Sequence, residues 1–375
     1  MNVGRRIKQQ QGYEAFVPDP FPPKEESSFS KKIIQKASQA TLFLGKLDGI
    51  TQLLPDLDFF LFMYLCKDAA SSSQIEGTRA TMIDAIEAVS KTSEDLPEDV
   101  DDISHYIQAL NYGLERLKDF PLSLRVIKEV HKELMVDARA SHYSDPGNFR
   151  KSQNWISGTS PKDALFVPPP PHEMIRAMGD LEKFFHAKDD ILPIIKAGII
   201  HAQFETIHPF LDGNGRTGRM LITLFLWLEK LLDRPVLFLS SYFKKHQRTY
   251  YARLDDYHNN KVESWLDFFL EGIIDTAQEA IETVKKITVL REEDMKKIHA
   301  LGKPAAKSMV LILSALYKLP IVNIANIQKW TKYTRQGAQK TIDRFVDLGI
   351  LEPKDEHKKY GRSFIYRRYV AIFNG

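Results

Sequence analysis

The chain is poor in cysteine. Among 375 residues there is one, Cys66. A single thiol can form no internal disulfide, which indicates a reducing, cytoplasmic setting. Cys66 stands in an apolar, helix-like stretch, where a small core residue is a more frequent finding than a nucleophile.

The chain also lacks long apolar runs and a strong net charge. No uncharged apolar run reaches the roughly eighteen residues of a membrane span, and the basic N-terminus lacks the apolar core of a signal peptide. A formal net charge of +3 is too small to predict nucleic-acid binding by itself. Hydrophobic content of 43% and charged content of 27% are those of a soluble globular protein. The length allows two or three domains.

The densest functional signal is the stretch HPFLDGNGRTGR at residues 208–219. It lies between residues 193–207 and 220–232, which are apolar enough for buried helices. We therefore expect a tight loop between two core helices, with the end of the stretch forming the start of the second helix. A helix start offers free backbone N–H groups and the positive end of the helix dipole, so an anion can bind there.

The glycines and arginines of this loop suit phosphate groups. Glycines let the backbone of residues 213–215 fold around an anion, with Asn214 taking left-handed dihedrals or capping the helix. Arg216 and Arg219, three positions apart, are expected to leave the helix on nearly the same side. Two guanidinium groups beside such a nest suit a polyphosphate better than a single phosphate.

Two further side chains of the loop supply reactive groups. Asp212 can bind Mg²⁺, which favours a carboxylate together with phosphate oxygens. His208 can accept a proton near neutral pH. A glycine-rich loop alone is usually a turn, and a lone histidine is usually structural. The co-occurrence of all these roles predicts a nucleotide-phosphate site with its own base.

The stretch 208–219 resembles the signature of the Fic (filamentation-induced-by-cAMP) family, HPFxDGNGRxxR, at every specified position. The preceding run 201–207, HAQFETI, is also typical of that family. The resemblance implies a mainly α fold, with a helical core and a small β-hairpin flap. It implies transfer of AMP from ATP to a Ser, Thr or Tyr hydroxyl of a target protein, with release of pyrophosphate.

By this resemblance, His208 deprotonates the target hydroxyl and Asp212 holds Mg²⁺. The resemblance also implies self-modification and a homodimer. The positions that would bind the phosphates of ATP are Gly213, Asn214, Gly215, Arg216, Thr217, Gly218 and Arg219.

The segment 71–77, SSSQIEG, precedes the catalytic part of the chain and allows two interpretations. Ser73 and Glu76 have the spacing of a capping box for a helix that begins near Thr78. That interpretation gives the segment a structural role only.

The second interpretation is regulatory. Ser72, Glu76 and Gly77 resemble the family's inhibitory motif, (Ser/Thr)-x-x-x-Glu-(Gly/Asn), in its class II position N-terminal to the core. By that resemblance, Glu76 would pair with Arg219 and occupy the place that this arginine needs for the γ-phosphate. Because a carboxylate and a guanidinium in a partly dry cleft pair strongly, we expect an autoinhibited enzyme.

Residues 143–171 change character. Short extended runs broken by glycine and proline predict a β-hairpin that projects from the helical body. By resemblance this hairpin is the family's flap, which holds a target segment by strand-like main-chain pairing. The alternative is an ordinary excursion between helices. The flap candidates are Asp163, Ala164, Leu165, Phe166 and Val167.

Aromatic residues follow the core helices and are candidates for the adenine and ribose pocket. Family members often place aromatic and amide groups there, which makes Tyr250, Tyr251 and His258 candidates. His258 departs from the family pattern, where an amide would be more usual. Aromatic residues with this spacing also occur in ordinary cores.

The two ends of the chain differ from its middle. Residues 1–28 carry several prolines and predict an extended arm. Residues 303–375 predict three helices and two short strands, which resembles a winged helix-turn-helix domain. Residues 326–370 hold 11 Lys and Arg against 5 Asp and Glu, a local charge of +6 that permits DNA contacts. Such domains also serve as protein-docking or dimer modules.

The predicted organisation is therefore an arm (1–28), a helical region with the inhibitory helix (29–118), a catalytic core (119–300) and a winged helix (303–375). Two rival functions remain. The same loop could remove AMP from a modified protein or transfer another nucleotide or phosphate group. Alternatively, the chain could be a DNA-binding regulator whose Fic domain senses a nucleotide.

Overall fold

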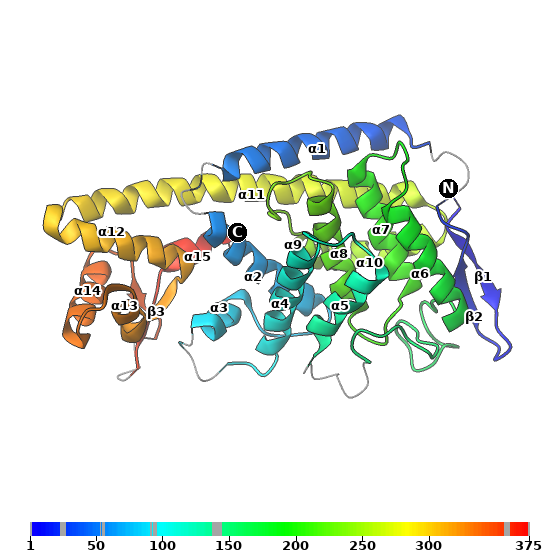
Figure 1. The fold of residues 1–375 in the computed structure, drawn as a ribbon, viewed down its shortest axis with the longest axis horizontal. Helices are drawn as coiled ribbons and strands as arrows, with labels where there is room; N and C mark the ends of the chain where they lie inside the picture. Colours follow the sequence, from blue (N-terminus) through cyan, green and yellow to red (C-terminus); the bar gives the residue numbers. More distant parts are fainter. Residues whose placement is uncertain are drawn as a thin grey trace. The chain divides into compact units, whose positions relative to one another are not determined.

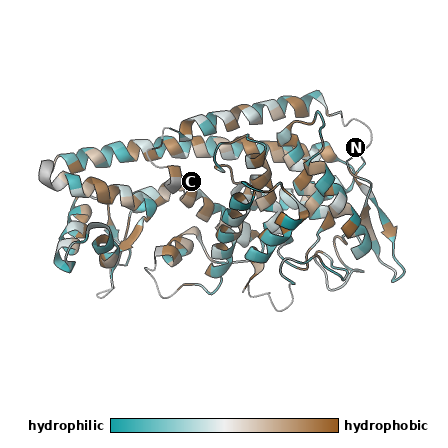
Figure 2. Cartoon of the chain, viewed as in Figure 1, coloured by the Kyte–Doolittle hydropathy of each residue, from teal (hydrophilic) through white to brown (hydrophobic). Residues whose placement is uncertain are grey.

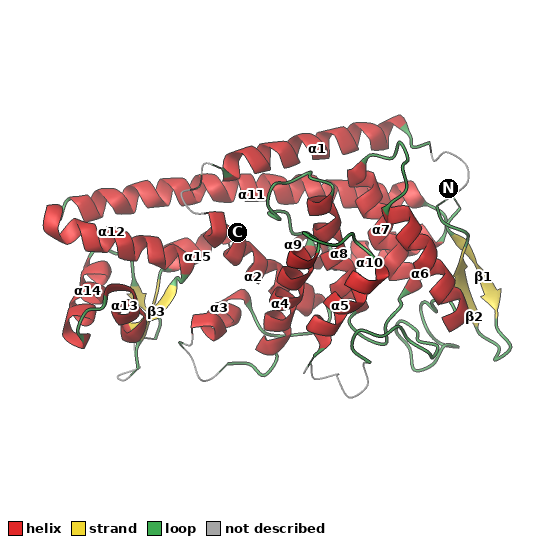
Figure 3. Ribbon diagram, in the orientation of Figure 1, coloured by secondary structure: helices red, strands yellow, loops and turns green. Residues whose placement is uncertain are grey.

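The computed structural model describes residues 2–22, 28–52, 54, 57–90, 92, 96–136, 145–355 and 361–373. Helices dominate, and the strands of these residues form a two-stranded and a three-stranded sheet (Figures 1 and 3). The fold is mainly helical, as predicted. None of the described helices is long and apolar enough to cross a membrane.

The chain divides into two compact units. Unit 1 comprises Met1–Asp48, Ser71–Thr78 and Asp101–Gln278, and unit 2 comprises Gly49–Ala70, Arg79–Val100 and Glu279–Gly375. Each unit thus consists of three separate segments, whereas the sequence analysis divides the chain into contiguous domains. Three long helices contribute residues to both units, namely α1 (Lys31–Thr51), α2 (Leu57–Ile75) and α11 (Val262–His299).

Unit 1 is built mainly from helices. One of them coincides with the predicted apolar segment 193–207, whereas another, over residues 214–228, begins and ends before the predicted segment 220–232 does. Along α1 and α11, teal and brown residues alternate, as expected for helices with one buried face (Figure 2). The remaining helices are α4 (Val100–Arg116), α5 (Leu124–Met135), α6 (Pro171–Phe185), α7 (Pro193–Ile207), α8 (Asn214–Leu228), α9 (Ser240–Lys245) and α10 (Gln247–His258).

The N-terminus differs from the prediction. In place of an extended arm over residues 1–28, β1 (Gly4–Lys8) and β2 (Glu14–Pro18) form an antiparallel hairpin. Phe16 is buried, and its backbone N–H donates to the carbonyl oxygen of Val167 at 2.8 Å. The prolines of this segment stand at the end of β2 or beyond it, so they do not interrupt the hairpin.

Helices α7 and α8 form the centre of unit 1. Every residue of α7 from Ile194 to Ile207 is buried, so this helix has no face exposed to solvent. Helix α11 packs closely against α7. Trp265 of α11 donates its Nε1–H to the carbonyl oxygen of Gly198 at 2.8 Å. A Cβ atom on Gly198 would lie 2.7 Å from the ring of Phe269.

The close approach of α7 and α11 at Gly198 predicts how a larger residue there would change stability. Gly198→Ala is expected to destabilise the protein by about 1–3 kcal/mol, because the added methyl group overpacks the contact with α11. Gly179 on α6 is the matched control, since a Cβ there meets nothing within 4 Å. Gly179→Ala should instead stabilise by roughly 0.5–1 kcal/mol through the better helix propensity of alanine. Thermal unfolding of both variants checks this; equal shifts would contradict it.

Unit 2 holds α3 (Met82–Ser90) and the C-terminal elements. After α12 (Lys303–Lys318), the chain forms β3 (Ile321–Asn323), α13 (Ile324–Thr331), α14 (Arg335–Asp347), β4 (Glu352–Pro353), β5 (Ser363–Ile365) and α15 (Arg367–Phe373). The strand order is β3-β5-β4, with antiparallel pairing throughout. Helices α12 to α14 and strands β4 and β5 match predicted elements, whereas β3 was not predicted.

Candidate active site

The loop between α7 and α8 is held by its own backbone geometry. Helix α7 ends at His208, which has φ 49° and ψ 62°, and Gly213 has φ 75° before α8 begins. The left-handed residue at the helix start is therefore Gly213, whereas Asn214, for which the sequence allowed either left-handed dihedrals or a capping role, is the first residue of α8. Asn214 instead accepts from the N–H of Phe210 at 2.8 Å and donates to its carbonyl at 2.9 Å, which closes the loop.

His208 lies at the mouth of this loop with its imidazole prepared to accept a proton. Its Nδ1 is 3.3 Å from the carbonyl oxygen of Glu205, an atom that can only accept. Nδ1 therefore carries the hydrogen, and Nε2 keeps a free lone pair. Burial, and then the positive charge of Arg150, lower the pKa of His208 to about 4. The ring is neutral at physiological pH, as a general base requires.

The two arginines of the motif have different partners. The guanidinium of Arg219 is buried and points to the 72–76 segment. Arg216 lies 3.8 Å from a carboxylate oxygen of Asp212 and 3.9 Å from one of Asp102. Both arginines also lie near enough to Glu76 for their positive charges to lower the pKa of its carboxyl group. Arg216, Thr217 and Arg219 are all buried in the first turns of α8.

Ser72 and Glu76 engage Arg219 together. Arg219 Nη2 donates to Glu76 Oε1 at 2.8 Å and to the carbonyl oxygen of Ser72 at 3.0 Å, while Nε donates to Ser72 Oγ at 2.9 Å. Burial raises the pKa of Glu76, but the charge and hydrogen bond of Arg219, together with the charges of Arg216 and His208, hold the pKa below its usual value. Glu76 is therefore a carboxylate at neutral pH.

Glu76 also lies close to the first turn of α8. A Cβ atom on Gly215 would be 2.3 Å from Glu76 Oε1, so only glycine permits this approach. Residues up to Ile75 form the last turn of α2, and Gly77 follows with φ 98°. Because α2 ends here and α3 begins at Met82, Ser73 does not cap a new helix, and the capping-box interpretation is wrong.

Asp212 is the one carboxylate of the loop. Its Oδ1 accepts from the N–H of Gly213 at 2.6 Å, and 46% of its side chain is exposed. Among the described residues there is no cluster of three acidic, histidine or cysteine ligands. A single exposed carboxylate fits Mg²⁺, which keeps waters and takes one or two carboxylates plus substrate phosphates.

The predicted adenine and ribose candidates separate into two groups. Tyr250 is buried at 1% exposure, and its hydroxyl is 2.9 Å from Nε2 of His201. It therefore cannot serve as an exposed platform for adenine. His258 stacks on Phe166 at 3.9 Å between ring centroids, and thus supports the flap. Tyr251 is 48% exposed and remains a candidate.

The buried Tyr250 belongs to a hydrogen-bonded chain beneath α8. His201 Nδ1 is 2.9 Å from the carbonyl oxygen of Gly218, so Nδ1 carries the hydrogen and Nε2 accepts from the hydroxyl of Tyr250. Gly218 is also close to Glu205, because a Cβ there would meet Glu205 Oε1 at 2.3 Å. These contacts fix the first turns of α8 to α7.

The predicted flap is a minimal hairpin. Ile156 and Phe166 form an antiparallel bridge, and the N–H of Leu165 donates to the carbonyl of Ile156 at 3.1 Å. Asp163 accepts hydrogen bonds within the turn, and Leu165 is 77% exposed at its end. Phe166 is buried, as is Val167 next to it. Residues 143 and 144 of the predicted segment lie outside the described residues.

Several residues that hold the loop were not recognised in the sequence. One of these residues is His131 on α5. Its ring stacks on Phe210 at 3.6 Å, and its Nε2 lies 2.9 Å from the carbonyl oxygen of Asp212. Arg150 and Asn154 donate to the carbonyl oxygen of His208. Each of these residues is far from the motif in sequence, so no local pattern identifies it.

Comparison with known families shows which domain contains the 208–219 stretch. The Fic/DOC family model matches residues 121–226, which include the whole 208–219 stretch, and the model of that family's N-terminal part matches residues 34–115. The chain contains a Fic/DOC domain. The N-terminal match covers Ser72 and Glu76, so these two residues and the 208–219 stretch both lie within regions that Fic/DOC family models match.

Curated relatives of the Fic/DOC domain are named protein adenylyltransferases. The chain is 29% identical over 167 residues to protein adenylyltransferase Fic of Aedes aegypti, which covers 43% of this chain and 30% of the relative. It is 30% identical over 156 residues to a probable protein adenylyltransferase of Aquifex aeolicus, covering 40% and 47%. The chain thus spans less than half the length of these relatives.

Solved structures share the fold. A Fic family protein from Desulfovibrio desulfuricans G20 aligns with a TM-score of 0.58 at 16% identity, over 92% of this chain and 98% of that one. A Fic domain-containing signaling protein from Bacteroides thetaiotaomicron aligns with a TM-score of 0.55 at 18% identity, over 67% and 97%. At these identities the likeness concerns the fold alone.

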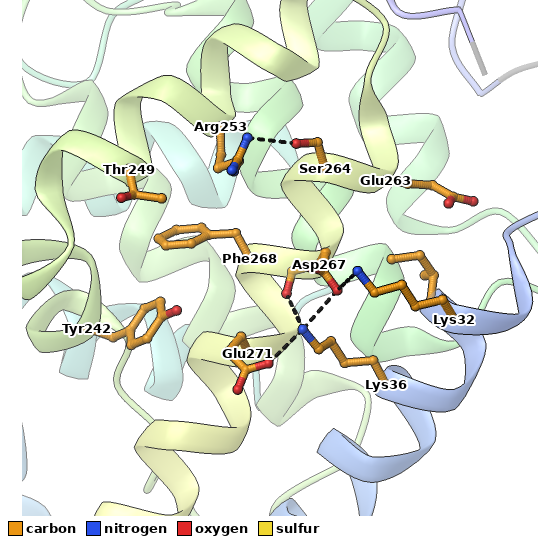
Figure 4. Close-up of a pocket in the computed structure, with 11 residues that line it drawn as sticks. Lys32, Lys36, Tyr242, Thr249, Arg253, Glu263, Ser264, Asp267, Phe268 and Glu271 are labelled. Carbon is orange, nitrogen blue, oxygen red and sulfur yellow. Dashed lines mark hydrogen bonds and ion pairs between the residues drawn. The ribbon is translucent and has the colours of Figure 1, made fainter.

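A separate pocket of about 500 Å³ lies between α1, α9, α10 and α11 in unit 1 (Figure 4). It shares no lining residue with the phosphate loop. Lys36 lies between the carboxylates of Asp267 and Glu271, at 2.8 and 2.6 Å (Figure 4). Because its cations are already paired, this pocket is a poor site for a nucleotide.

Proposed function

We propose that the protein is an autoinhibited adenylyltransferase that transfers AMP from ATP to a hydroxyl of a target protein, and to itself. The observation that carries the proposal is the geometry of one loop. In this loop His208 Nδ1 faces the carbonyl oxygen of Glu205, which leaves Nε2 as the proton acceptor, and Gly215 and Arg219 follow in the first turns of α8. The relatives named protein adenylyltransferases support the same activity.

The proposed reaction is an in-line displacement at the α-phosphorus. The target oxygen forms a bond to phosphorus, the bond to the β-phosphate oxygen breaks, and pyrophosphate leaves. The hydroxyl proton passes to Nε2 of His208. Asp212 would hold Mg²⁺, which neutralises charge on the phosphates. The backbone N–H groups of the loop and the arginines would hold the phosphates in place, so positioning and charge stabilisation supply most of the catalysis.

Glu76 is proposed to act as the lock. Its carboxylate occupies one side of the Arg219 guanidinium, at 2.8 Å. An anionic γ-phosphate that binds Arg219 from the same side must displace this carboxylate or be repelled by its negative charge. The pairing therefore favours the inactive state until Glu76 moves.

Labelled ATP tests the proposal. Self-labelling and labelling of a cell extract should be compared with α-labelled and γ-labelled ATP, in the presence of Mg²⁺. AMP transfer predicts label on protein from α-labelled ATP only. Label from the γ position would replace the proposal with phosphate transfer. Release of AMP from a modified target that requires Glu76 would instead support AMP removal.

A second function is proposed for the C-terminal elements, as a winged helix-turn-helix that binds DNA. Helix α14 buries Ala338, Ile342 and Phe345 on one face and exposes a basic and polar face. Its exposed side chains include Arg335, Gln336, Lys340 and Arg344. Basic and amide side chains on one exposed helix face are the donors that duplex DNA requires.

Binding of the full chain to a DNA duplex across a salt series tests this second function. Affinity should fall with salt, and Lys340→Ala should lower the slope of log affinity against log salt by about 1. Lys183→Ala on α6 of unit 1 is the control, and should leave that slope unchanged. The idea fails if the chain shows no salt-dependent binding; the domain would then be a protein-docking module.

A further inference from the structure

Arg150 binds carbonyl oxygens from three separate segments of the chain. Its Nε donates to the carbonyl of His208 at 2.9 Å, Nη1 to Ser152 at 3.0 Å, and Nη2 to Pro169 at 2.5 Å and Ile207 at 3.4 Å. Ser152 stands before the flap and Pro169 after it. One guanidinium therefore ties both legs of the flap to the end of α7.

This arginine is buried without an acidic partner. It is 2% exposed, and within the described part of the chain no carboxylate forms an ion pair with it. Burial lowers the pKa of Arg150 to about 10, which still leaves it charged at neutral pH. A buried unpaired charge is costly, and an apolar residue of similar volume would fill the space without that cost. The planar donors of arginine, directed at four carbonyls, account for its presence.

The residue at the centre of this arrangement is strained. His208 has φ 49°, a left-handed conformation that residues with a Cβ rarely adopt. Its carbonyl oxygen receives Arg150 Nε at 2.9 Å and Asn154 Nδ2 at 3.4 Å. Asn154 also donates to the carbonyl of Phe210 at 3.0 Å. The direction of the imidazole follows from this backbone, so the donors that hold the carbonyl also aim the ring.

We propose that Arg150 is a positioning residue that holds the His208 base and the two legs of the flap in one geometry. This rests on the proposed function, in which His208 takes the proton of a hydroxyl presented at the flap. The distance between the target strand and the base is then set by Arg150. The phosphate-binding side of the site is independent of it, because Arg219 and Gly215 make no hydrogen bond or ion pair with Arg150.

The test uses the full chain carrying Glu76→Gly, with self-labelling from α-labelled ATP measured over a range of ATP concentrations. Arg150→Met removes every donor, whereas Arg150→Lys keeps the charge but not the planar fork. For Arg150→Met, kcat should fall by about 10²-fold, since misplacement by about 1 Å costs that much. The KM for ATP and directly measured ATP affinity should stay within about threefold. The kcat of Arg150→Lys should lie between that of Arg150→Met and that of the Glu76→Gly parent.

Arg176→Met is the matched control. Arg176 also donates to a backbone carbonyl, that of Pro18 at 2.5 Å, but it lies on α6 and pairs with Glu173 and Asp180. The Arg176→Met substitution should leave kcat and the KM for ATP unchanged. Asn154→Ala, which removes the second donor to the His208 carbonyl, should lower kcat by about tenfold and serves if Arg150→Met does not fold.

The outcomes separate the two proposals. Loss of kcat with retained ATP affinity supports the positioning role of Arg150. A folded Arg150→Met protein with normal kcat, or one that loses ATP affinity and kcat equally, would overturn it. If the Glu76→Gly parent binds ATP but transfers no label, the proposed function fails instead, and the Arg150 variants cannot be the cause.

Discussion

Glu76→Gly is expected to raise the rate of AMP transfer by about 10²-fold at limiting ATP. A hydrogen bond to a charged group contributes about 1.5–3 kcal/mol, and each 1.36 kcal/mol corresponds to a factor of ten. Removing the carboxylate frees Arg219, which is otherwise held at 2.8 Å. The gain should appear mainly as a lower KM for ATP, obtained from label transfer measured over a range of concentrations of α-labelled ATP.

Two milder variants refine this prediction. Glu76→Gln keeps the size of the side chain but removes its charge, so it should give a smaller gain than glycine. Ser72→Ala removes the hydroxyl that accepts from Arg219 Nε at 2.9 Å but leaves the carboxylate in place, so it should give the smallest gain. Equal transfer by wild type and all three variants would show that this ion pair does not inhibit the enzyme.

His208→Ala in the Glu76→Gly background is expected to lower transfer by about 10²–10⁴-fold, the usual contribution of a general base. ATP affinity should change little, because the phosphates are proposed to contact the loop backbone and Arg219 rather than the imidazole. Label transfer and nucleotide titration on the same sample separate the two effects. A folded variant that keeps substantial transfer removes His208 as the base.

The pH dependence of transfer gives a second check on His208. Its pKa is lowered to about 4, so the imidazole stays unprotonated well below the ordinary histidine value of about 6.5. As pH falls from about 8 to about 6, the rate should therefore stay nearly level. A rate that halves near pH 6.5 would mean that the base is exposed to water during catalysis.

The site was predictable where the chemistry is local in sequence. His208, Asp212, Gly215 and Arg219 fall in one stretch of twelve residues, because a helix start with flanking side chains is itself a local structure. The Glu76–Arg219 pair was also anticipated, although 143 positions separate the two residues. That expectation came from resemblance, since spacing in the chain does not reveal it.

The errors have a common physical cause. Tyr250 and Tyr251 are neighbours of the same type, yet one is 1% exposed and the other 48%. The face of α10 that packs on α7 decides which tyrosine is buried, and no pattern within α10 alone specifies that packing. The N-terminal hairpin was missed for a similar reason, since Phe16 pairs with Val167 through contacts that exist only in the folded chain.

By itself, the sequence determined the helical character of the chain and the apolar segments that form its core helices, and it indicated the reactive groups of the 208–219 stretch. Apolar periodicity and a helix start are properties of short segments, so they can be read locally. Only the tertiary structure decided that Arg150, Asn154 and His131 hold the loop between α7 and α8, and that Glu76 lies against Gly215. Those contacts join residues far apart in the chain, and they form only when the packing of the helices brings the segments together.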